Sequence, residues 1–255
     1  MKNILLLLIA VTAFSCSEDD SAIVTNPEPT PAGDVVLLRK KISTNNQNVY
    51  TSIFNYDGNK LMSIVNSDGY KYNYTYQNGK LAMQQIVDAE GVIETTSTYT
   101  YTGDKLSEYR SVTSFEDTNF GNKVIYTYNE DSTISTKYYD LTNNGNTETL
   151  KHNGLYTLTN GNITSYIRTL VGTGRTYVLN FTYDNKNNPD KNKFSNMVET
   201  LTWGSGGNNN ILSISDITGS PITDHTTTYT YTYNSDNYPI TQTNAAGNVT
   251  QFFYE

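Results

Sequence analysis

Residues 54–61 read FNYDGNKL, and this stretch returns along most of the chain. It recurs as YTYQNGKL at 74–81 and as YTYTGDKL at 99–106, where two aromatic residues stand two positions apart before a turn. Stretched or degenerate copies begin at Tyr126, Tyr156, Phe181 and Tyr231. Successive copies start 20, 25, 27, 30, 25 and 50 residues apart. A period of this size indicates an array of small supersecondary units.

Each unit contains two expected strands. One strand ends in the aromatic pair, and the next starts at the Leu or Ile after the turn, as at Leu61 and Leu81. A second turn then closes the unit, for example Ser67-Asp68-Gly69. Asn-Gly and Asp-Gly pairs supply the positive φ angles that tight hairpins need. The pattern therefore predicts antiparallel hairpins, with each strand paired to its sequence neighbour.

The fold class predicted for residues 34–255 is all-β. Aromatic residues two apart, such as Tyr72 and Tyr74, point to one face of a sheet. A long meander twists strongly, so we expect an elongated, strongly twisted or curled antiparallel meander built from hairpin repeats. Its last strand, residues 251–255, is expected to leave a sheet edge free for pairing with a partner or another copy.

Composition excludes several classes of protein. The 255 residues are only 36% apolar and 16% charged, and they include 22 Tyr. This profile argues against a helical protein, a multi-span membrane protein and a charge-driven disordered chain. The net charge of −8 argues against a nucleic acid or an anionic membrane surface as partner.

The first residues have the pattern of an export signal. A short basic start, Met1-Lys2-Asn3, precedes an apolar run from Ile4 to Ala13 that is too short to span a bilayer as a helix. Cys16 lies three residues after the end of that run. Because it is the only cysteine in the chain, it cannot form an internal disulfide. Residues 1–15 are therefore predicted to be a signal peptide.

Residues 13–20 resemble a bacterial lipoprotein signal. Ser15 is the small residue that precedes the cysteine in that pattern, although Ala13 and Phe14 differ from its commonest form. The resemblance implies that Cys16 is the lipid attachment site and the mature N-terminus. The acidic run at 17–20 resembles the stretch that follows the cysteine in surface-exported lipoproteins of Bacteroidetes; a solvated linker is the alternative.

Residues 16–33 are predicted to form the lipidated N-terminus and a spacer. Pro27, Pro29 and Pro31 alternate with other residues, and this favours an extended, semi-rigid chain. The expected location is the outer membrane, lipid-anchored and surface-exposed. The membrane is the partner expected through the anchor.

The repeat also resembles a known family of repeats. Phe54 to Leu61, with an Asp-Gly turn some residues later, is similar to the tyrosine–aspartate (YD) or RHS-type repeat. It further resembles repeat-bearing lipoproteins of Bacteroidetes, over roughly residues 50–255. The resemblance implies a β-repeat architecture and only weakly an activity. RHS-type families wind long arrays into a shell around a toxin, whereas this array has about seven units.

No motif in the sequence indicates catalysis, a metal or a cofactor. His152 and His225 have no partner at metal-ligand spacing and are expected to lie on the surface. The oxygen-rich loop at 184–190 could hold calcium, but a plain turn explains the same residues. The carboxylates are scattered over turns, so no acid and base pair can be singled out.

The tyrosines are the remaining candidates for function. Sheet packing explains their spacing, and the alternative is a platform that stacks on sugar rings or on protein partners. The candidate platform residues are Tyr74, Tyr76, Tyr99, Tyr101, Tyr126, Tyr128 and Trp203. The sequence therefore favours a non-catalytic scaffold, adhesion or ligand-binding surface, with a glycan or a surface protein as candidate partner. The alternatives are a polysaccharide-degrading enzyme and a short partner of an RHS-type toxin system.

Overall fold

The computed structural model describes residues 35–255 except 46–47, 116–117, 195–197, 204–206 and 218–224. The predicted signal peptide, Cys16 and the proline-rich spacer lie outside the described residues. Residues 35–255 form one compact unit. No helix in this described part is both long and apolar enough to cross a membrane.

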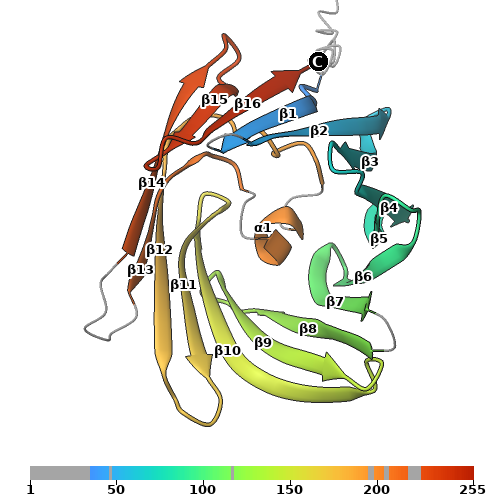
Figure 1. Ribbon diagram of the computed structural model, residues 1–255. Helices are drawn as coiled ribbons and strands as arrows, with labels where there is room; N and C mark the ends of the chain where they lie inside the picture. The colour runs from blue at the N-terminus through green and yellow to red at the C-terminus, as the bar shows by residue number, and fades with distance from the viewer. Residues whose placement is uncertain (1–34, 46–47, 116–117, 195–197, 204–206, 218–224) are drawn as a thin grey trace, which may run out of the picture. The chain divides into compact units, whose positions relative to one another are not determined.

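The described chain forms sixteen strands and one short helix, α1 (Val198–Trp203). The first eight strands are β1 (Leu38–Asn45), β2 (Asn48–Asp57), β3 (Lys60–Asn66), β4 (Lys71–Gln77), β5 (Lys80–Val87), β6 (Ile93–Thr102), β7 (Lys105–Phe115) and β8 (Thr118–Tyr128). The other eight are β9 (Thr133–Thr142), β10 (Thr147–Thr159), β11 (Asn162–Leu170), β12 (Thr176–Tyr183), β13 (Ile211–Ile217), β14 (His225–Tyr233), β15 (Pro239–Asn244) and β16 (Val249–Tyr254). Every strand pairs antiparallel with its sequence neighbour, and β1 pairs with β16 to close a barrel (Figure 1).

The predicted antiparallel hairpins are confirmed, but the predicted open, elongated meander is wrong. β1 and β16 are in register from Leu38 opposite Tyr254 to Thr44 opposite Val249. Residues 251–254 therefore lie within a paired strand, and the expected free sheet edge does not exist. The tight turns form as expected: Asn78 and Gly79 have φ angles of 51° and 78°, the positive values that a two-residue hairpin turn requires.

A recurring β-bulge bends the meander toward closure. In the β6–β7 hairpin, Tyr101 pairs with Leu106 but Thr100 pairs with Glu108, so Ser107 is an extra residue. The same shift, with one extra residue near the start of the second strand, occurs in the pairs β2–β3, β4–β5, β10–β11, β12–β13 and β14–β15. Bulges increase local twist and bend a strand, which is how sheets are curved into barrels.

Five tyrosines each link their own strand to the strand that precedes it in the barrel. Their hydroxyls donate hydrogen bonds to the carbonyl oxygen of a residue at the start of that preceding strand. The five bonds are Tyr76 to Leu61 at 2.8 Å, Tyr101 to Leu81 at 2.9 Å, Tyr183 to Ile163 at 2.6 Å, Tyr231 to Ile211 at 2.8 Å and Tyr254 to Pro239 at 2.8 Å. We call these residues the linking tyrosines. The sequence repeat is thus a repeated contact between hairpins.

Removal of one linking hydroxyl is expected to have a modest effect. Tyr101→Phe keeps the ring in place but leaves the Leu81 carbonyl oxygen without this donor. We therefore expect the free energy of unfolding to fall by about 1 kcal/mol. Tyr139→Phe is the matched control, because within the described chain the Tyr139 hydroxyl makes no hydrogen bond. Urea unfolding of both variants measures the difference. Equal loss in both would contradict a role for the bond.

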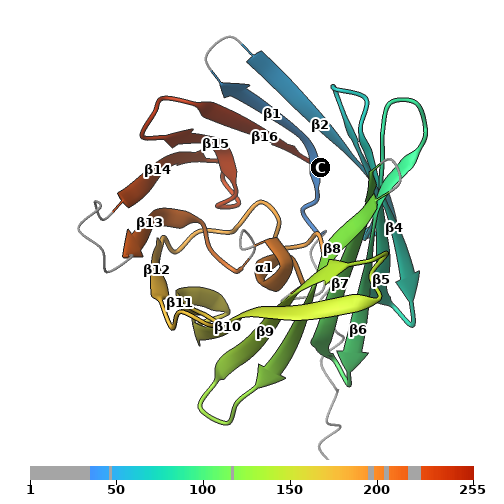
Figure 2. The same cartoon turned by 60° about the horizontal axis from the view of Figure 1, so that its bottom comes forward.

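The lumen holds a segment of the chain itself. A barrel of sixteen strands is too wide for its own side chains to fill, and the described residues of the connection between β12 and β13 (184–194, 198–203 and 207–210) enter the space (Figure 2). We call its described residues the plug. Its helix α1 buries Val198 and Leu201, and the Tyr126 hydroxyl donates to the Leu201 carbonyl at 3.2 Å. One half of the lumen is therefore a packed core.

Asparagine side chains fasten the plug to the wall. The Asn162 Oδ1 atom accepts from the backbone N–H groups of Asn208 and Asn209 at 2.9 and 3.1 Å. The Asn210 Nδ2 atom donates to Asp184 Oδ2 at 3.0 Å and joins the two ends of the plug, while the Tyr233 hydroxyl of β14 donates to the same Asp184 oxygen. Because these groups are half-buried or buried, their pairing removes a desolvation cost that would otherwise oppose insertion.

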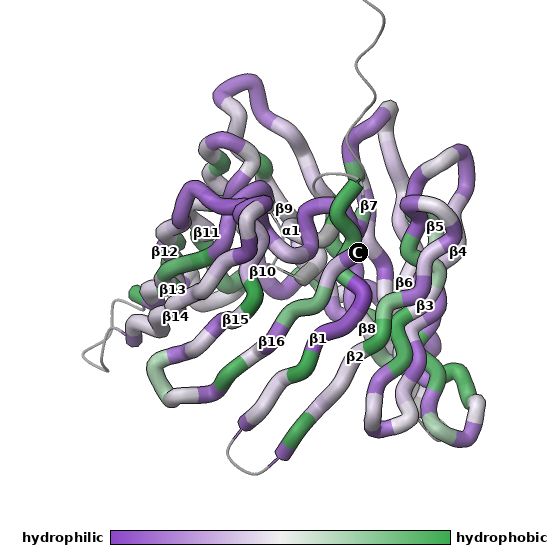
Figure 3. Tube along the Cα trace, turned by 90° about the horizontal axis from the view of Figure 1, so that it is seen from above, coloured by the Kyte–Doolittle hydropathy of each residue, from purple (hydrophilic) through white to green (hydrophobic). Residues whose placement is uncertain are grey.

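Hydrophilic and hydrophobic residues are interspersed along the strands (Figure 3), and exposed strand positions carry both kinds. Exposed threonines recur at outward positions of the strands: Thr75, Thr98, Thr100, Thr127, Thr157, Thr182, Thr228, Thr230 and Thr232. Charged side chains also lie on this face, where Glu148 forms ion pairs with Arg110 and Lys123. The outward apolar residue Ile53 lies opposite Lys40. The outward face of the wall therefore carries hydroxyls, charges and scattered apolar side chains such as Ile53, Val65 and Phe253, and the inward face carries aromatic rings.

Candidate ligand-binding lumen

The half of the lumen away from the tight turns contains three cavities. We name them by one lining residue each: the Lys41 cavity of about 340 Å³, the Arg168 cavity of about 260 Å³ and the Asp190 cavity of about 440 Å³. Lys41 lines both the first and the third cavity, and Tyr109 lines both the first and the second. The three spaces therefore share walls inside one lumen.

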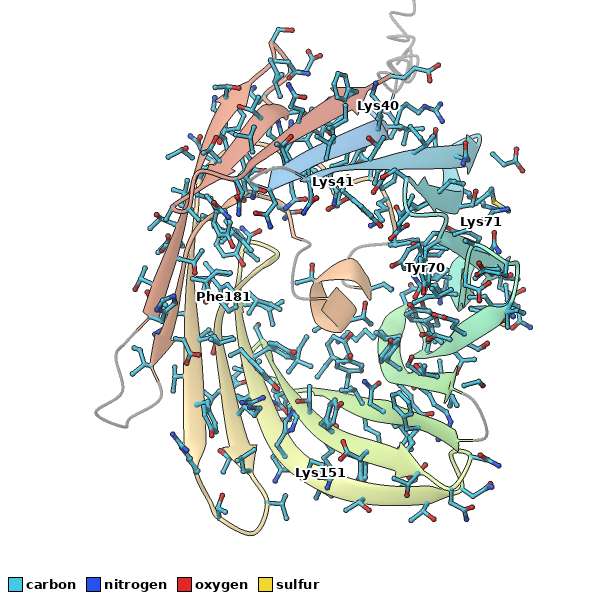
Figure 4. The ribbon with its side chains drawn as sticks, viewed as in Figure 1. Lys40, Lys41, Tyr70, Lys71, Lys151 and Phe181 are labelled. Atoms are coloured by element: carbon cyan, nitrogen blue, oxygen red, sulfur yellow. The ribbon has the colours of Figure 1, made fainter. Side chains whose placement is uncertain are left out.

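Strand alternation points Lys41 into the lumen. Its register partners are Ser52 on β2 and Phe252 on β16, which are both buried, whereas Lys40 lies next to the exposed Phe253. Figure 4 labels Lys41 on the lumen side of β1 and Lys40 on the other side. The alternation of a strand thus gives these adjacent lysines opposite environments.

The wall of the Lys41 cavity combines aromatic rings with amides and hydroxyls. Gln84 Nε2 donates to the Tyr74 hydroxyl at 3.3 Å, and Ser97 Oγ donates to Ser111 Oγ at 3.0 Å. Tyr72 lies beside them, and burial raises the pKa of its hydroxyl. These groups offer a ligand both apolar surface and hydrogen-bonding partners, which is the usual lining of a small-molecule site.

The Arg168 cavity is built around stacked rings. Tyr138 stacks on His152 with ring centroids 4.5 Å apart, and Tyr156 stacks on Tyr166 at 4.3 Å. Burial, with Arg168 nearby, holds the pKa of His152 below its usual value, so the imidazole is neutral at pH 7. The expectation that His152 lies on the surface is wrong, because its strand turns this position toward the lumen; His225 is exposed as expected.

The Asp190 cavity contains one carboxylate. Asp190 Oδ1 lies 3.7 Å from Lys193 Nζ, and Lys193 also lies over the rings of Phe54 and Phe194. Of the described residues, Asp190 is the one carboxylate that lines any of these three cavities. The geometry that a pair of glycosidase carboxylates requires is therefore not found in them.

The structure divides the predicted platform tyrosines between the core and its rim. Tyr74, Tyr99 and Tyr126 are 4–5% exposed and belong to the packed core. The other three, Tyr76, Tyr101 and Tyr128, are half-buried and pack against it. The side chain of Trp203 lies outside the described residues. Tyr74 also lines the Lys41 cavity and Tyr126 the Arg168 cavity. The cavity tyrosines outside the predicted set include Tyr72, Tyr109, Tyr138 and Tyr166.

Sequence reasoning missed most of these cavity residues. Tyr72 belongs to the Tyr72, Tyr74, Tyr76 stripe, so its inward direction was readable from alternation. Tyr109 stands three positions after Leu106, and only the bulge turns both side chains inward. The Leu-x-x-Tyr spacing of Leu106 and Tyr109 was the feature of the sequence that could have predicted this inward direction.

The 184–190 loop uses its carboxylate internally. Asp184 Oδ1 accepts from the backbone N–H groups of Lys186 and Asn210, and Asp184 Oδ2 accepts from Asn210 Nδ2 and the Tyr233 hydroxyl. In the described part of the chain, no group of three or more His, Cys, Asp or Glu side chains could hold a metal ion. This loop serves to attach the plug.

Comparison with known proteins yields structural neighbours only. No family model matches the chain, and no curated protein matches it. A porin-like protein from Bacteroides vulgatus ATCC 8482 has a similar crystal structure, with a TM-score of 0.61 and 12% identity over 87% of this chain and 99% of that one. A porin-like protein from Bacteroides uniformis ATCC 8492 gives 0.47 and 13% over 85% and 95%.

The first likeness concerns the fold alone, because the identity is so low. It agrees with the closed barrel described above. The predicted membership among YD or RHS-type repeats is therefore wrong. In this chain the bulges and the β1–β16 pairing close the array of aromatic hairpins into a ring.

Proposed function

We propose that this chain is a non-catalytic binding protein of the bacterial cell surface that takes a carbohydrate into the lumen of its barrel. The observation that carries the proposal is the lining of the Lys41 and Arg168 cavities. Tyrosine rings offer flat apolar faces against which sugar C–H groups stack, and the hydroxyls and amides beside them can pair with sugar hydroxyls. Shared walls between the cavities suit a chain of several sugar units.

The outer wall supports a barrel that stands in water beside the membrane. Barrels that span a bilayer carry an outward apolar band and a polar interior, whereas this wall carries exposed threonines and the Arg110–Glu148–Lys123 ion pairs outside, with aromatic rings inside. We therefore propose attachment to the outer membrane through a lipid on Cys16, with residues 17–33 as the spacer.

Carbohydrate binding is tested with a matched pair of adjacent residues on opposite faces of β9. Tyr138 lines the Arg168 cavity, whereas Tyr139 lies on the outside over Lys123. Calorimetric titration with oligosaccharides chosen from a glycan array is expected to show affinity about tenfold weaker in Tyr138→Ala and unchanged in Tyr139→Ala. Absence of binding to every glycan, or equal losses in both variants, would contradict a lumen site.

The anchor is tested separately in cells. Labelled palmitate is expected to enter the wild-type protein and not Cys16→Ser, and the variant is expected to leave the membrane fraction. A Ser15→Thr variant controls for a general effect of substitutions at the cleavage region. Label in Cys16→Ser would refute the anchor and leave the lumen proposal intact.

A further inference from the structure

The charges around two of the cavities have one sign. Lys41 and Lys193 line the Lys41 cavity, and Arg168 lines the Arg168 cavity beside the neutral His152. Among the described residues, no carboxylate lines either space. The chain as a whole is acidic, with a net charge of −8, so its composition does not explain a cationic lining. A specific reason is therefore needed for the presence of these cationic side chains at the cavities.

Lys41 carries a half-buried charge without a protein partner. Across the described residues, its ammonium group makes no ion pair and no side-chain hydrogen bond, whereas Lys193 in the same cavity lies 3.7 Å from Asp190. A partly desolvated, unpaired charge costs folding free energy. That cost is recovered when an anion enters the cavity.

Arg168 is in a comparable position on β11. Its guanidinium lies 4.6 Å from the ring centroid of Tyr177 and makes no ion pair or hydrogen bond among the described residues. The stacked ring holds the guanidinium plane, and its N–H groups remain available. A planar guanidinium matches a carboxylate with two parallel hydrogen bonds, which a lysine cannot do.

An unsatisfied acceptor lies in the same cavity as Arg168. The Asn122 Oδ1 atom is buried and accepts no hydrogen bond. Buried acceptors are nearly always paired in native proteins, so this atom is suited to a hydroxyl donor from a ligand. A carboxylate acceptor for Arg168 and a hydroxyl donor for Asn122 occur together on a uronic acid ring.

We infer that the lumen selects acidic oligosaccharides, with a sugar carboxylate on Arg168, a sugar hydroxyl on Asn122 and a further carboxylate on Lys41. Tyr109 lines both cavities, so the two cations belong to adjoining spaces. This inference rests on the proposed carbohydrate-binding function and adds its chemical class.

The test compares oligogalacturonate with its fully methyl-esterified counterpart, which keeps the rings and removes the charge. By calorimetry, the acid is expected to bind at least about tenfold tighter than the ester. Arg168→Gln and Lys41→Gln are each expected to weaken acid binding by about tenfold and ester binding by clearly less. Lys137→Gln, an exposed outward position on β9, is the matched control and is expected to change neither.

The outcomes separate the two proposals. Equal binding of acid and ester, or equal losses of both in Arg168→Gln, would overturn the acidic preference and keep carbohydrate binding. Binding of neither probe or of any other glycan would overturn both. A sulfated glucan oligosaccharide that binds tighter than the uronate would contradict the carboxylate assignment.

Discussion

Leu106→Ala is expected to lower the free energy of unfolding by about 2–5 kcal/mol, among the largest effects of any single substitution in the wall. Leu106 is 2% exposed and belongs to the core formed by the aromatic pairs and the plug helix. Truncation removes buried methyl groups and leaves a cavity that a barrel wall, fixed by its hydrogen-bond ladders, cannot easily collapse to fill.

Thermal and urea unfolding of Leu106→Ala measure this loss, with an expected fall in Tm on the order of 10 °C. Leu212→Ala is the matched control, because Leu212 also lies in a strand but is 37% exposed. We expect its loss to be below about 1 kcal/mol. Similar losses in the two variants would mean that Leu106 does not belong to a packed core.

Raising the pH above 10 is expected to unfold the protein. Burial raises the pKa of the linking tyrosines Tyr76, Tyr101, Tyr183 and Tyr231 to about 12, from the ordinary value of 10. Between these values the unfolded chain releases tyrosine protons that the folded chain keeps. Their contribution to stability is therefore complete below pH 10 and is lost as the pH rises through about 12.

A spectrophotometric titration with circular dichroism in parallel tests this expectation. Tyrosinate absorbance from the linking tyrosines is expected to appear together with loss of the strand signal. A Tyr101→Phe/Tyr183→Phe variant is expected to show a shallower fall of stability with pH, because two of the perturbed groups are gone. Complete tyrosine ionisation near pH 10 with the fold intact would contradict the account.

The strands and tight turns were predictable because local residues determine them. Asn78-Gly79 has the chemistry of its turn, and the pairs Tyr74–Tyr76 and Tyr99–Tyr101 alternate as their strands require. Closure was not predictable in this way, since it depends on the summed bend of repeated bulges and on a pairing between Leu38–Thr44 and Val249–Tyr254. No local pattern encodes a contact across the whole chain.

The binding lumen was missed for a related reason. The aromatic stripes were explained by sheet packing, with an exposed platform as the alternative. In a closed ring one face becomes an interior, and the plug then decides which part of that interior is packed. The sequence indicated only an oxygen-rich loop at 184–190, and the burial of the plug follows from the width of the barrel. Lys41 and Arg168 gained their significance from facing the space that the plug leaves open.

Closure of the barrel is the claim on which the lumen and both proposals depend, and a cysteine pair across the β1–β16 seam tests it directly. Ser43 and Thr250 are register partners with side-chain oxygens 3.2 Å apart, which suits a disulfide. In a Cys16→Ser background, Ser43→Cys/Thr250→Cys is expected to form an intramolecular disulfide with unchanged circular dichroism. Ser43→Cys/Thr228→Cys, with Thr228 exposed on β14, is expected to form none. Failure of the first pair to cross-link in the folded monomer would contradict a closed barrel and return the chain to an open sheet.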